Sequence, residues 1–167
     1  MNHFLIKLFS LKLNRPSGTG ISLKCIATGS PLPQVTWTLD GFQIPEDGRF
    51  RVGDYVTAGG LLVSYVNISQ TRPEDGGRYE CLAGNELASV QFSGRLQVLG
   101  PPVVRSMPNR TAVNGEPLTL NCPVGGHPIQ AIYWEKGQYT VDSAVNCFFP
   151  FDFNFKHMNR KDQNYNF

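Results

Sequence analysis

The stretch DGGRYEC, residues 75–81, decides the fold of this chain. It fits the pattern D-x-G-x-Y-x-C, with Asp75, Gly77, Tyr79 and Cys81 at alternate positions. In an extended strand, residues two apart face the same side, so Tyr79 and Cys81 both point toward a core. A tyrosine at this place can send its hydroxyl back to the backbone of the preceding corner. The stretch therefore predicts a buried strand that begins at a tight corner.

Two further strands are expected before this corner. The stretches RFRVGDYV (49–56) and LLVSYVNIS (61–69) alternate between apolar and polar residues, as half-buried strands do. Asp75 is placed to pair with an arginine at the start of an earlier strand, and Arg49 is the candidate. In the second strand Val66 and Ile68 are expected to face inward, which turns Asn67 outward.

A repeat extends the interpretation in both directions. ISLKCIATGSPLPQVTW (21–37) and LTLNCPVGGHPIQAIYW (118–134) match at an offset of 97, since 122 − 25 = 97 and 134 − 37 = 97. Each copy is expected to form a strand, a Gly/Pro turn and a second strand, with Trp37 against Cys25 across the gap between two sheets. The identical positions are Leu23, Cys25, Gly29, Pro31 and Trp37 in the first copy, and Leu120, Cys122, Gly126, Pro128 and Trp134 in the second.

In combination, these cysteines, tryptophans and the D-x-G-x-Y-x-C stretch resemble an immunoglobulin domain of the I-set type across about residues 13–99. The resemblance implies an all-β, immunoglobulin-like β-sandwich, with one nearly complete domain followed by the N-terminal half of a second. It also implies a disulfide between Cys25 and Cys81, which would stabilise the domain by about 4 kcal/mol. Its core-signature residues would be Trp37, Asp75, Gly77, Tyr79 and Trp134.

The expected domain boundaries depend on this repeat. A second D-x-G-x-Y-x-C stretch is expected near residue 178, since 81 + 97 = 178, but the sequence ends at 167. We therefore expect a non-homologous, disordered leader (1–12), an I-set domain (13–99), a stiff Gly-Pro-Pro linker (100–102), a truncated second domain (103–136) and a non-homologous, disordered tail (137–167). One hypothesis is that both ends are read-through from noncoding sequence.

The two remaining cysteines are expected to be unpaired. Cys147 lies 25 residues after Cys122 (147 − 122 = 25), whereas Cys81 lies 56 after Cys25 (81 − 25 = 56). Val145 stands two residues before Cys147, where the intact copy has a tyrosine. A zinc set of Cys122, His127, Cys147 and His157 is a weaker alternative, because its spacings are irregular.

Composition and motifs argue against several function classes. The net charge of +2 is too balanced to predict binding to nucleic acid or to an anionic membrane. No sequence motif of a catalytic, cofactor or nucleotide site is found, so we expect no enzyme, no cofactor and no small-molecule substrate. Arg49, Arg51 and Arg78 could form a heparan sulfate patch, although a solvated strand face explains them more simply.

Two N-x-S/T sequons point to an extracellular setting. They are Asn67-Ile68-Ser69 and Asn109-Arg110-Thr111. Glycosylation occurs in the secretory pathway, where disulfides are also stable. An unmodified surface asparagine remains the alternative at each site. The N-terminal stretch MNHFLIKLFSLKLN is a poor signal peptide, because Lys7 and Lys12 interrupt it, and no run approaches the ~20 apolar residues of a membrane span.

The sequence of residues 13–136 resembles consecutive domains of the arthropod Down syndrome cell adhesion molecule family, notably in "EDGGRYEC" and "NGEPLTLNCPVGGHPIQAIYWEK". The resemblance implies a fragment of a neuronal cell-surface receptor that acts in homophilic recognition, axon guidance and dendrite self-avoidance. Its partner would be a second copy, and its membrane contact would be a transmembrane segment of the parent protein. The alternatives are a ligand-binding module of another receptor, a structural intracellular module and a module of an extracellular matrix enzyme.

Overall fold

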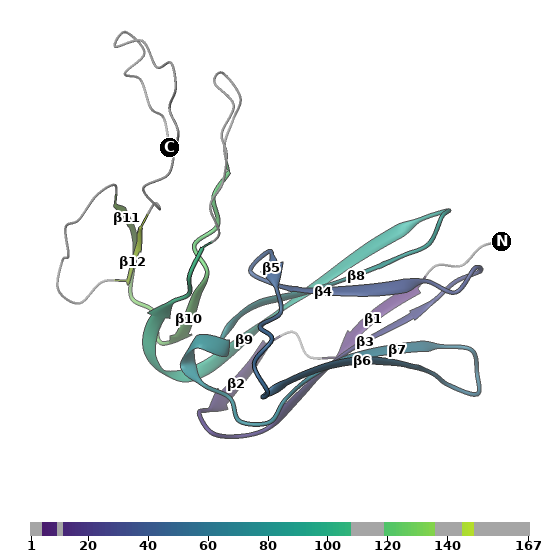
Figure 1. Cartoon of the computed structure of the whole chain (residues 1–167), viewed down its shortest axis with the longest axis horizontal. Coiled ribbons are helices and arrows are strands. Elements are labelled where there is room, and N and C mark those ends of the chain that lie inside the picture. Colours follow the sequence, from purple (N-terminus) through teal and green to yellow (C-terminus); the bar gives the residue numbers. More distant parts are fainter. Residues whose placement is uncertain (1–4, 10–11, 108–118, 136–144, 149–167) are drawn as a thin grey trace, which may run out of the picture.

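The computed structural model of the 167-residue chain describes residues 5–9, 12–107, 119–135 and 145–148. Its described elements are strands and one short 3₁₀ turn, η1 (Pro73–Asp75). The strands form two main sheets that lie face to face, with an additional pair of short strands to one side (Figure 1). The predicted all-β sandwich is therefore confirmed.

The first sheet contains four antiparallel strands. In spatial order these are β1 (Leu5–Phe9), β3 (Ile21–Thr28), β7 (Leu62–Ile68) and β6 (Phe50–Val56). Successive residues of a strand point to opposite faces. In β3 this alternation buries Ile21, Leu23 and Cys25 and exposes Ser22 and Lys24. One face of the sheet is thus apolar and covers the core.

The second sheet is built around the predicted buried strand. Its order is β10 (Val124–His127), β9 (Ser89–Val104), β8 (Gly77–Gly84), β4 (Gln34–Leu39) and β5 (Phe42–Gln43). A further strand, β2 (Lys12–Pro16), runs parallel to β9. The alternation of β8 buries Tyr79 and Cys81, as the sequence predicts.

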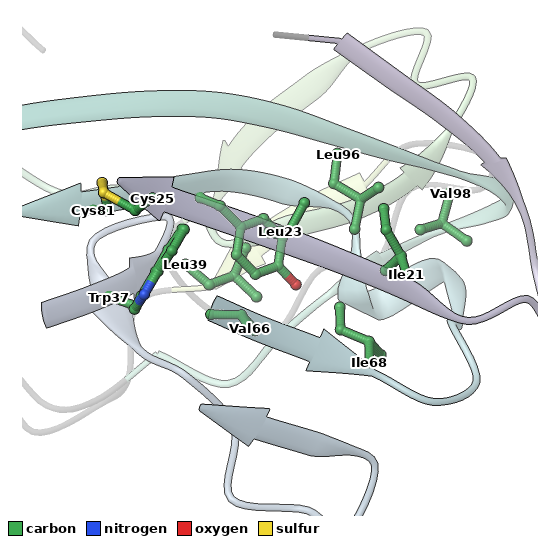
Figure 2. Close-up of a cluster of buried hydrophobic side chains, with 11 residues drawn as sticks. Ile21, Leu23, Cys25, Trp37, Leu39, Val66, Ile68, Cys81, Leu96 and Val98 are labelled. Carbon is green, nitrogen blue, oxygen red and sulfur yellow. A yellow bond between two sulfur atoms is a disulfide. The ribbon is translucent and has the colours of Figure 1, made fainter. Parts of the chain in front are cut away.

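The core lies between the two sheets and joins strands that are distant in sequence (Figure 2). Trp37 and Leu39 of β4 face Val66 and Ile68 of β7 in one cluster. Burial of each such side chain contributes about 1.5–3 kcal/mol. The buried cluster consists of Ile21, Leu23, Cys25, Trp37, Leu39, Val66, Ile68, Tyr79, Cys81, Leu96 and Val98.

Within the expected leader (1–12), the described residues 5–9 and 12 lie in strands and not in a disordered segment. Strand β1 pairs with β3, with Leu5 opposite Thr28 and Phe9 opposite Lys24, and β2 begins at Lys12. Both strands obtain their hydrogen bonds from partners far along the chain. A search for local apolar periodicity does not detect such pairing, because the hydrogen bonds of an edge strand come from a partner strand elsewhere in the chain.

The C-terminal part also departs from expectation at three places. Residues 125–127 do not form a turn, because β10 pairs with the end of β9. The tail is not wholly structureless, because β12 (Val145–Phe148) lies parallel to β11 (Ile132–Glu135), with Cys147 opposite Trp134. Strand β9 runs without interruption through residues 100–102, the expected linker.

Candidate interaction surfaces

The predicted disulfide joins the two sheets of the sandwich. Cys25 of β3 and Cys81 of β8 are bonded across a sequence separation of 56, and neither is accessible to solvent. Trp37 of β4 lies beside them (Figure 2) and donates a hydrogen bond from Nε1 to Ser64 Oγ of β7 at 2.8 Å. Ser64 was not predicted from the sequence. It gives the buried indole N–H an acceptor, which a tryptophan in a core requires.

Tyr79 and Asp75 form the corner at the start of β8. The Tyr79 hydroxyl donates to the carbonyl oxygen of Asp75 at 2.8 Å. The burial of Tyr79 raises the pKa of its hydroxyl, so the group stays protonated and can donate. The Asp75 carboxylate accepts a hydrogen bond from the amide of Arg72 at 2.7 Å. These bonds hold the turn η1 against the first residues of β8.

Arg49 and Asp75, the predicted pair, are in direct contact. Arg49 Nη1 lies 2.6 Å from Asp75 Oδ2, and Nη2 lies 3.0 Å from Oδ1. This two-bonded arrangement is the strong geometry for an arginine and a carboxylate. The side chain of Asp75 is 2% exposed, and hydrogen bonding to it raises the pKa of Arg49 further above its usual value. The pair therefore keeps a buried charge compensated at the corner.

Gly77 comes directly after the corner, at a position where a side chain has no room. Its φ is 150°, and a Cβ atom there would lie 2.5 Å from Asp40 Oδ2 and 2.7 Å from Leu39 Cδ1. The glycine of the motif thus lets β8 approach the end of β4. It also leaves room for the Asp40 carboxylate beside the corner.

The outer face of the first sheet carries the Asn67 sequon. Val66 and Ile68 are buried, as predicted, and Asn67 points to the opposite face, half-buried between Ser22 of β3 and Arg51 of β6. Two residues before it, the ring of Tyr65 lies over Gly53 of β6. Use of Asn67 as a glycan acceptor stays a prediction, and Asn109 lies outside the described residues.

Exposed apolar residues gather along β6, the last strand of the first sheet. Val52, Tyr55 and Val56 are 53%, 48% and 52% exposed. Within the described part of the chain, β6 pairs only with β7, so its other edge offers free N–H and C=O groups. Exposed apolar groups beside an unpaired edge are typical of strands that receive a partner. We refer to Val52, Tyr55, Val56 and this edge as the β6 edge.

The prediction that Cys122 is unpaired is wrong, because Cys122 is disulfide-bonded. The prediction assumed that only the 56-residue spacing of the first copy could bring a partner within reach. The described part of the second segment differs from the first copy, since the next described strand after β11 is β12, which lies parallel to β11. The side chains of Trp134 and Cys147 lie outside the described residues.

The geometry of the described residues gives no support to the zinc site or to the basic patch for heparan sulfate. Among the described residues, no group of three or more His, Cys, Asp or Glu side chains could hold a metal ion. The three arginines of the possible basic patch do not act together. Arg49 is used by Asp47 and Asp75, and Arg78 pairs with Glu80 at 2.9 Å. No helix in the described part of the chain is long and apolar enough to cross a membrane.

One pair was missed in the sequence, namely Asp40 and Arg105. The two side chains form an ion pair and are 14% and 16% exposed. Asp40 stands in the turn between β4 and β5, and Arg105 comes after β9, 65 residues later. The Asp40-Gly41 turn was a local signal, but nothing local indicated its partner.

Comparison with known proteins agrees with this arrangement. The family model described as the immunoglobulin I-set domain matches residues 3–98. The chain belongs to the immunoglobulin I-set family. The match includes residues 3–12, which were expected to form the leader.

The similarity continues beyond the first domain. The chain is 52% identical to cell adhesion molecule Dscam2 of Drosophila melanogaster over 120 residues, which is 72% of this chain and 6% of that protein. It is 42% identical to cell adhesion molecule DSCAM of Gallus gallus over 132 residues, 79% of this chain and 6% of that protein. Since 120 residues exceed the 98 at which the I-set match ends, the similarity includes part of the segment after it.

A solved structure is similar over the same extent. It is the crystal structure of the N-terminal eight Ig domains of Down Syndrome Cell Adhesion Molecule (DSCAM), isoform 1.30.30, with a TM-score of 0.72 and 38% identity over 77% of this chain and 17% of that chain. The resemblance to this cell adhesion family is therefore confirmed, although the chain spans a small fraction of each relative's length.

Proposed function

We propose that this chain is an immunoglobulin module of a cell-surface adhesion receptor. The observation that carries the proposal is the 52% identity to Drosophila Dscam2 over 72% of the chain, together with a sandwich whose signature residues lie in place. The proposed partner is a protein, and the proposed role has no enzymatic step, cofactor or nucleic acid. Residues 103–136 are the proposed start of a second module of the same receptor.

The setting is extracellular in this proposal. The disulfide between Cys25 and Cys81 requires an oxidising environment to persist in most organisms. Asn67 lies on the outer face of a sheet, where a glycan would not disturb the core. Secretion of the chain from eukaryotic cells tests this, with mass spectrometry before and after glycosidase treatment. A glycan on Asn67 is expected; a secreted chain with Asn67 bare would remove this support.

We further propose that recognition is homophilic and uses the β6 edge. Two copies paired edge to edge would be related by a two-fold axis, with the same residues on both sides. Main-chain hydrogen bonds between the two edges would supply register, and Val52 and Tyr55 would supply apolar contact. Axon guidance and dendrite self-avoidance belong to the proposed parent receptor and would result from such recognition.

Sedimentation of the full chain over a range of concentrations tests the homophilic proposal. We expect a reversible dimer that is lost when Val52 is replaced by lysine, because an edge lysine opposes strand pairing. The control is Leu82→Lys, which places the same charge on the outer face of the other sheet, where Leu82 is 44% exposed. A monomer at every concentration, or equal loss in both variants, would contradict the proposal.

An intracellular structural module is the main alternative. The cysteines of such a module would be reduced, so alkylation of the denatured chain from its native source would add the same mass with and without prior reduction. A ligand-binding receptor module would instead remain monomeric in sedimentation and bind a different protein. The two measurements together separate the three functions.

A further inference from the structure

Arg105 turns back from the segment after β9 and contacts the first module. Its Nη2 forms an ion pair with Asp40 Oδ2, and its Nη1 donates to the carbonyl oxygens of Glu74 and of Gly76, the latter at 2.7 Å. Asp40 belongs to the β4–β5 turn, whereas Glu74 and Gly76 belong to the corner around η1. A single side chain therefore joins two loops of the first module to the segment after it.

The acceptors are prepared by the first module itself. Asp40 Oδ1 accepts the amide of Arg78 at 2.8 Å, and the Asp40 amide donates to the Arg78 carbonyl at 2.8 Å. These bonds orient the carboxylate so that Oδ2 points to Arg105. Desolvation by burial raises the pKa of Asp40, while the Arg78 amide and Arg105 oppose this shift. A carboxylate in such a place is costly unless a cation faces it.

Glycines let the segment after β9 approach this corner closely. A Cβ atom on Gly125 of β10 would collide with Pro73 O and lie 2.9 Å from Glu74 Cα. A Cβ atom on Gly76, at the corner, would lie 3.2 Å from Gly126 N of β10. The amide of Arg105 also donates to Pro123 O at 2.8 Å, which connects the docking arginine to the residue before β10. Main chain thus packs directly on main chain.

We propose that Asp40, Glu74 and Gly76 form a docking site for the stretches 101–107 and 119–127, and that Arg105 is the residue that occupies it. The occupant is a part of the same chain, the proposed start of the second module. Docking would hold this segment at one orientation relative to the first sandwich. The proposal does not depend on the adhesive function, because it concerns contacts within one chain.

Arginine is suited to this site and lysine is not. The acceptors are one carboxylate oxygen and two carbonyl oxygens from two different loops. The planar guanidinium can donate to all three in a fixed geometry, whereas an ammonium group on a flexible stem acts as a point charge. An Arg105→Lys variant keeps the positive charge, but we expect it to lose most of the docking.

Hydrogen–deuterium exchange of the full chain tests the proposal. In Arg105→Ala we expect the amides of β10 to exchange at least about tenfold faster, since hydrogen bonds to a charged group are lost and the segment opens locally. Arg105→Lys should show most of this increase. Arg51→Ala is the matched control, because Arg51 is exposed on the opposite sheet. Amides of β3, β7 and β8 should keep their protection in all three.

A second variant keeps Arg105 and removes the close contact. Gly125→Ala places a methyl group against Pro73 and should also increase exchange of β10. Asp40→Asn keeps an oxygen for the Arg78 amide but removes the charge that faces Arg105, and we expect an intermediate increase. Unchanged exchange of β10 in both Arg105→Ala and Gly125→Ala, or an equal increase in Arg51→Ala, would overturn the proposal.

Discussion

Arg49 and Arg105 make the same chemical contact in two different parts of the molecule. Each arginine is mostly buried and faces an aspartate, and each also donates to main-chain carbonyl groups. Arg49 and Asp75 lie 26 residues apart inside one sandwich, whereas Arg105 and Asp40 lie 65 apart and join the sandwich to the next segment. The first pair stabilises a module, and the second orients the segment after that module.

The difference lies in what each pair supports. Asp75 is 2% exposed and also accepts the Arg72 amide within the corner, so loss of Arg49 leaves a charge in the core of the module. Asp40 is 14% exposed at the end of the sandwich. When Arg105 is removed and the segment after β9 separates from the sandwich, water can hydrate the Asp40 carboxylate. Substitutions in the two regions should therefore differ in their effect on the free energy of unfolding.

Removal of the core disulfide should have the largest effect. The double variant Cys25→Ala/Cys81→Ala opens a loop of 56 residues, and we expect the free energy of unfolding to fall by about 4 kcal/mol. Urea unfolding followed by tryptophan fluorescence measures this. Both arginine ion pairs depend on the folded sandwich, so both should break in the same unfolding transition of this variant. A decrease below about 1 kcal/mol would show that the sheets are held by packing alone.

Arg49→Ala should come next, with a loss of about 3 kcal/mol, because it leaves the buried Asp75 carboxylate without its cation. Arg51→Ala, two residues further along the chain, should change little, since Arg51 is exposed. Arg105→Ala should reduce the global free energy of unfolding by much less than Arg49→Ala, although it opens β10. If the two arginine variants lost equal stability, the contrast between module and junction would fail.

Tyr79→Phe should cost about 1.5 kcal/mol. It removes the hydroxyl that donates to Asp75 O at 2.8 Å, and it does so within a buried site where water cannot replace the bond. Tyr55→Phe is the control, because Tyr55 is 48% exposed on β6. Thermal unfolding of both variants measures the difference. Equal midpoints for the two would indicate that the corner is held mainly by Arg49.

The smallest effect concerns pH and Asp40. Burial raises the pKa of this carboxyl above its ordinary value of 3.8, against the Arg78 amide, Arg105 and Arg95. The folded state therefore binds the proton more readily than the unfolded state. The stabilising contribution of protonated Asp40 is full below pH 3.8 and is lost as the pH rises through the folded-state pKa.

Urea unfolding at several pH values tests this sign. On acidification from pH 7, the wild-type chain should gain stability relative to Asp40→Asn, which cannot titrate at this position. A relative loss in the wild type would mean that the ion pair with Arg105 outweighs the burial of Asp40. In that case the Asp40–Arg105 ion pair would stabilise the folded chain in the same way as the Arg49–Asp75 ion pair.

Much of the sandwich could be predicted because its signals are local. The alternation around Cys25, Val66 and Tyr79 defines inward faces, and D-x-G-x-Y-x-C combines a corner, a core strand and a cysteine in seven residues. The first strands were missed because β1 and β2 are edge strands, whose formation depends on hydrogen bonds from distant partners. The Cys122 error has a similar origin, since a spacing carried over from one copy cannot describe a different backbone path.

The interior of the first module was thus specified within short stretches of the chain, because period-two burial, turn residues and the cysteine–tryptophan pattern are local properties. Two features depended instead on the three-dimensional fold: which sheet edges receive the N-terminal strands, and that Asp40 and Arg105 meet. Those contacts join residues that have no local relation to one another. They exist only after the sandwich has formed and has brought the β4–β5 turn, the η1 corner and the segment after β9 to one place.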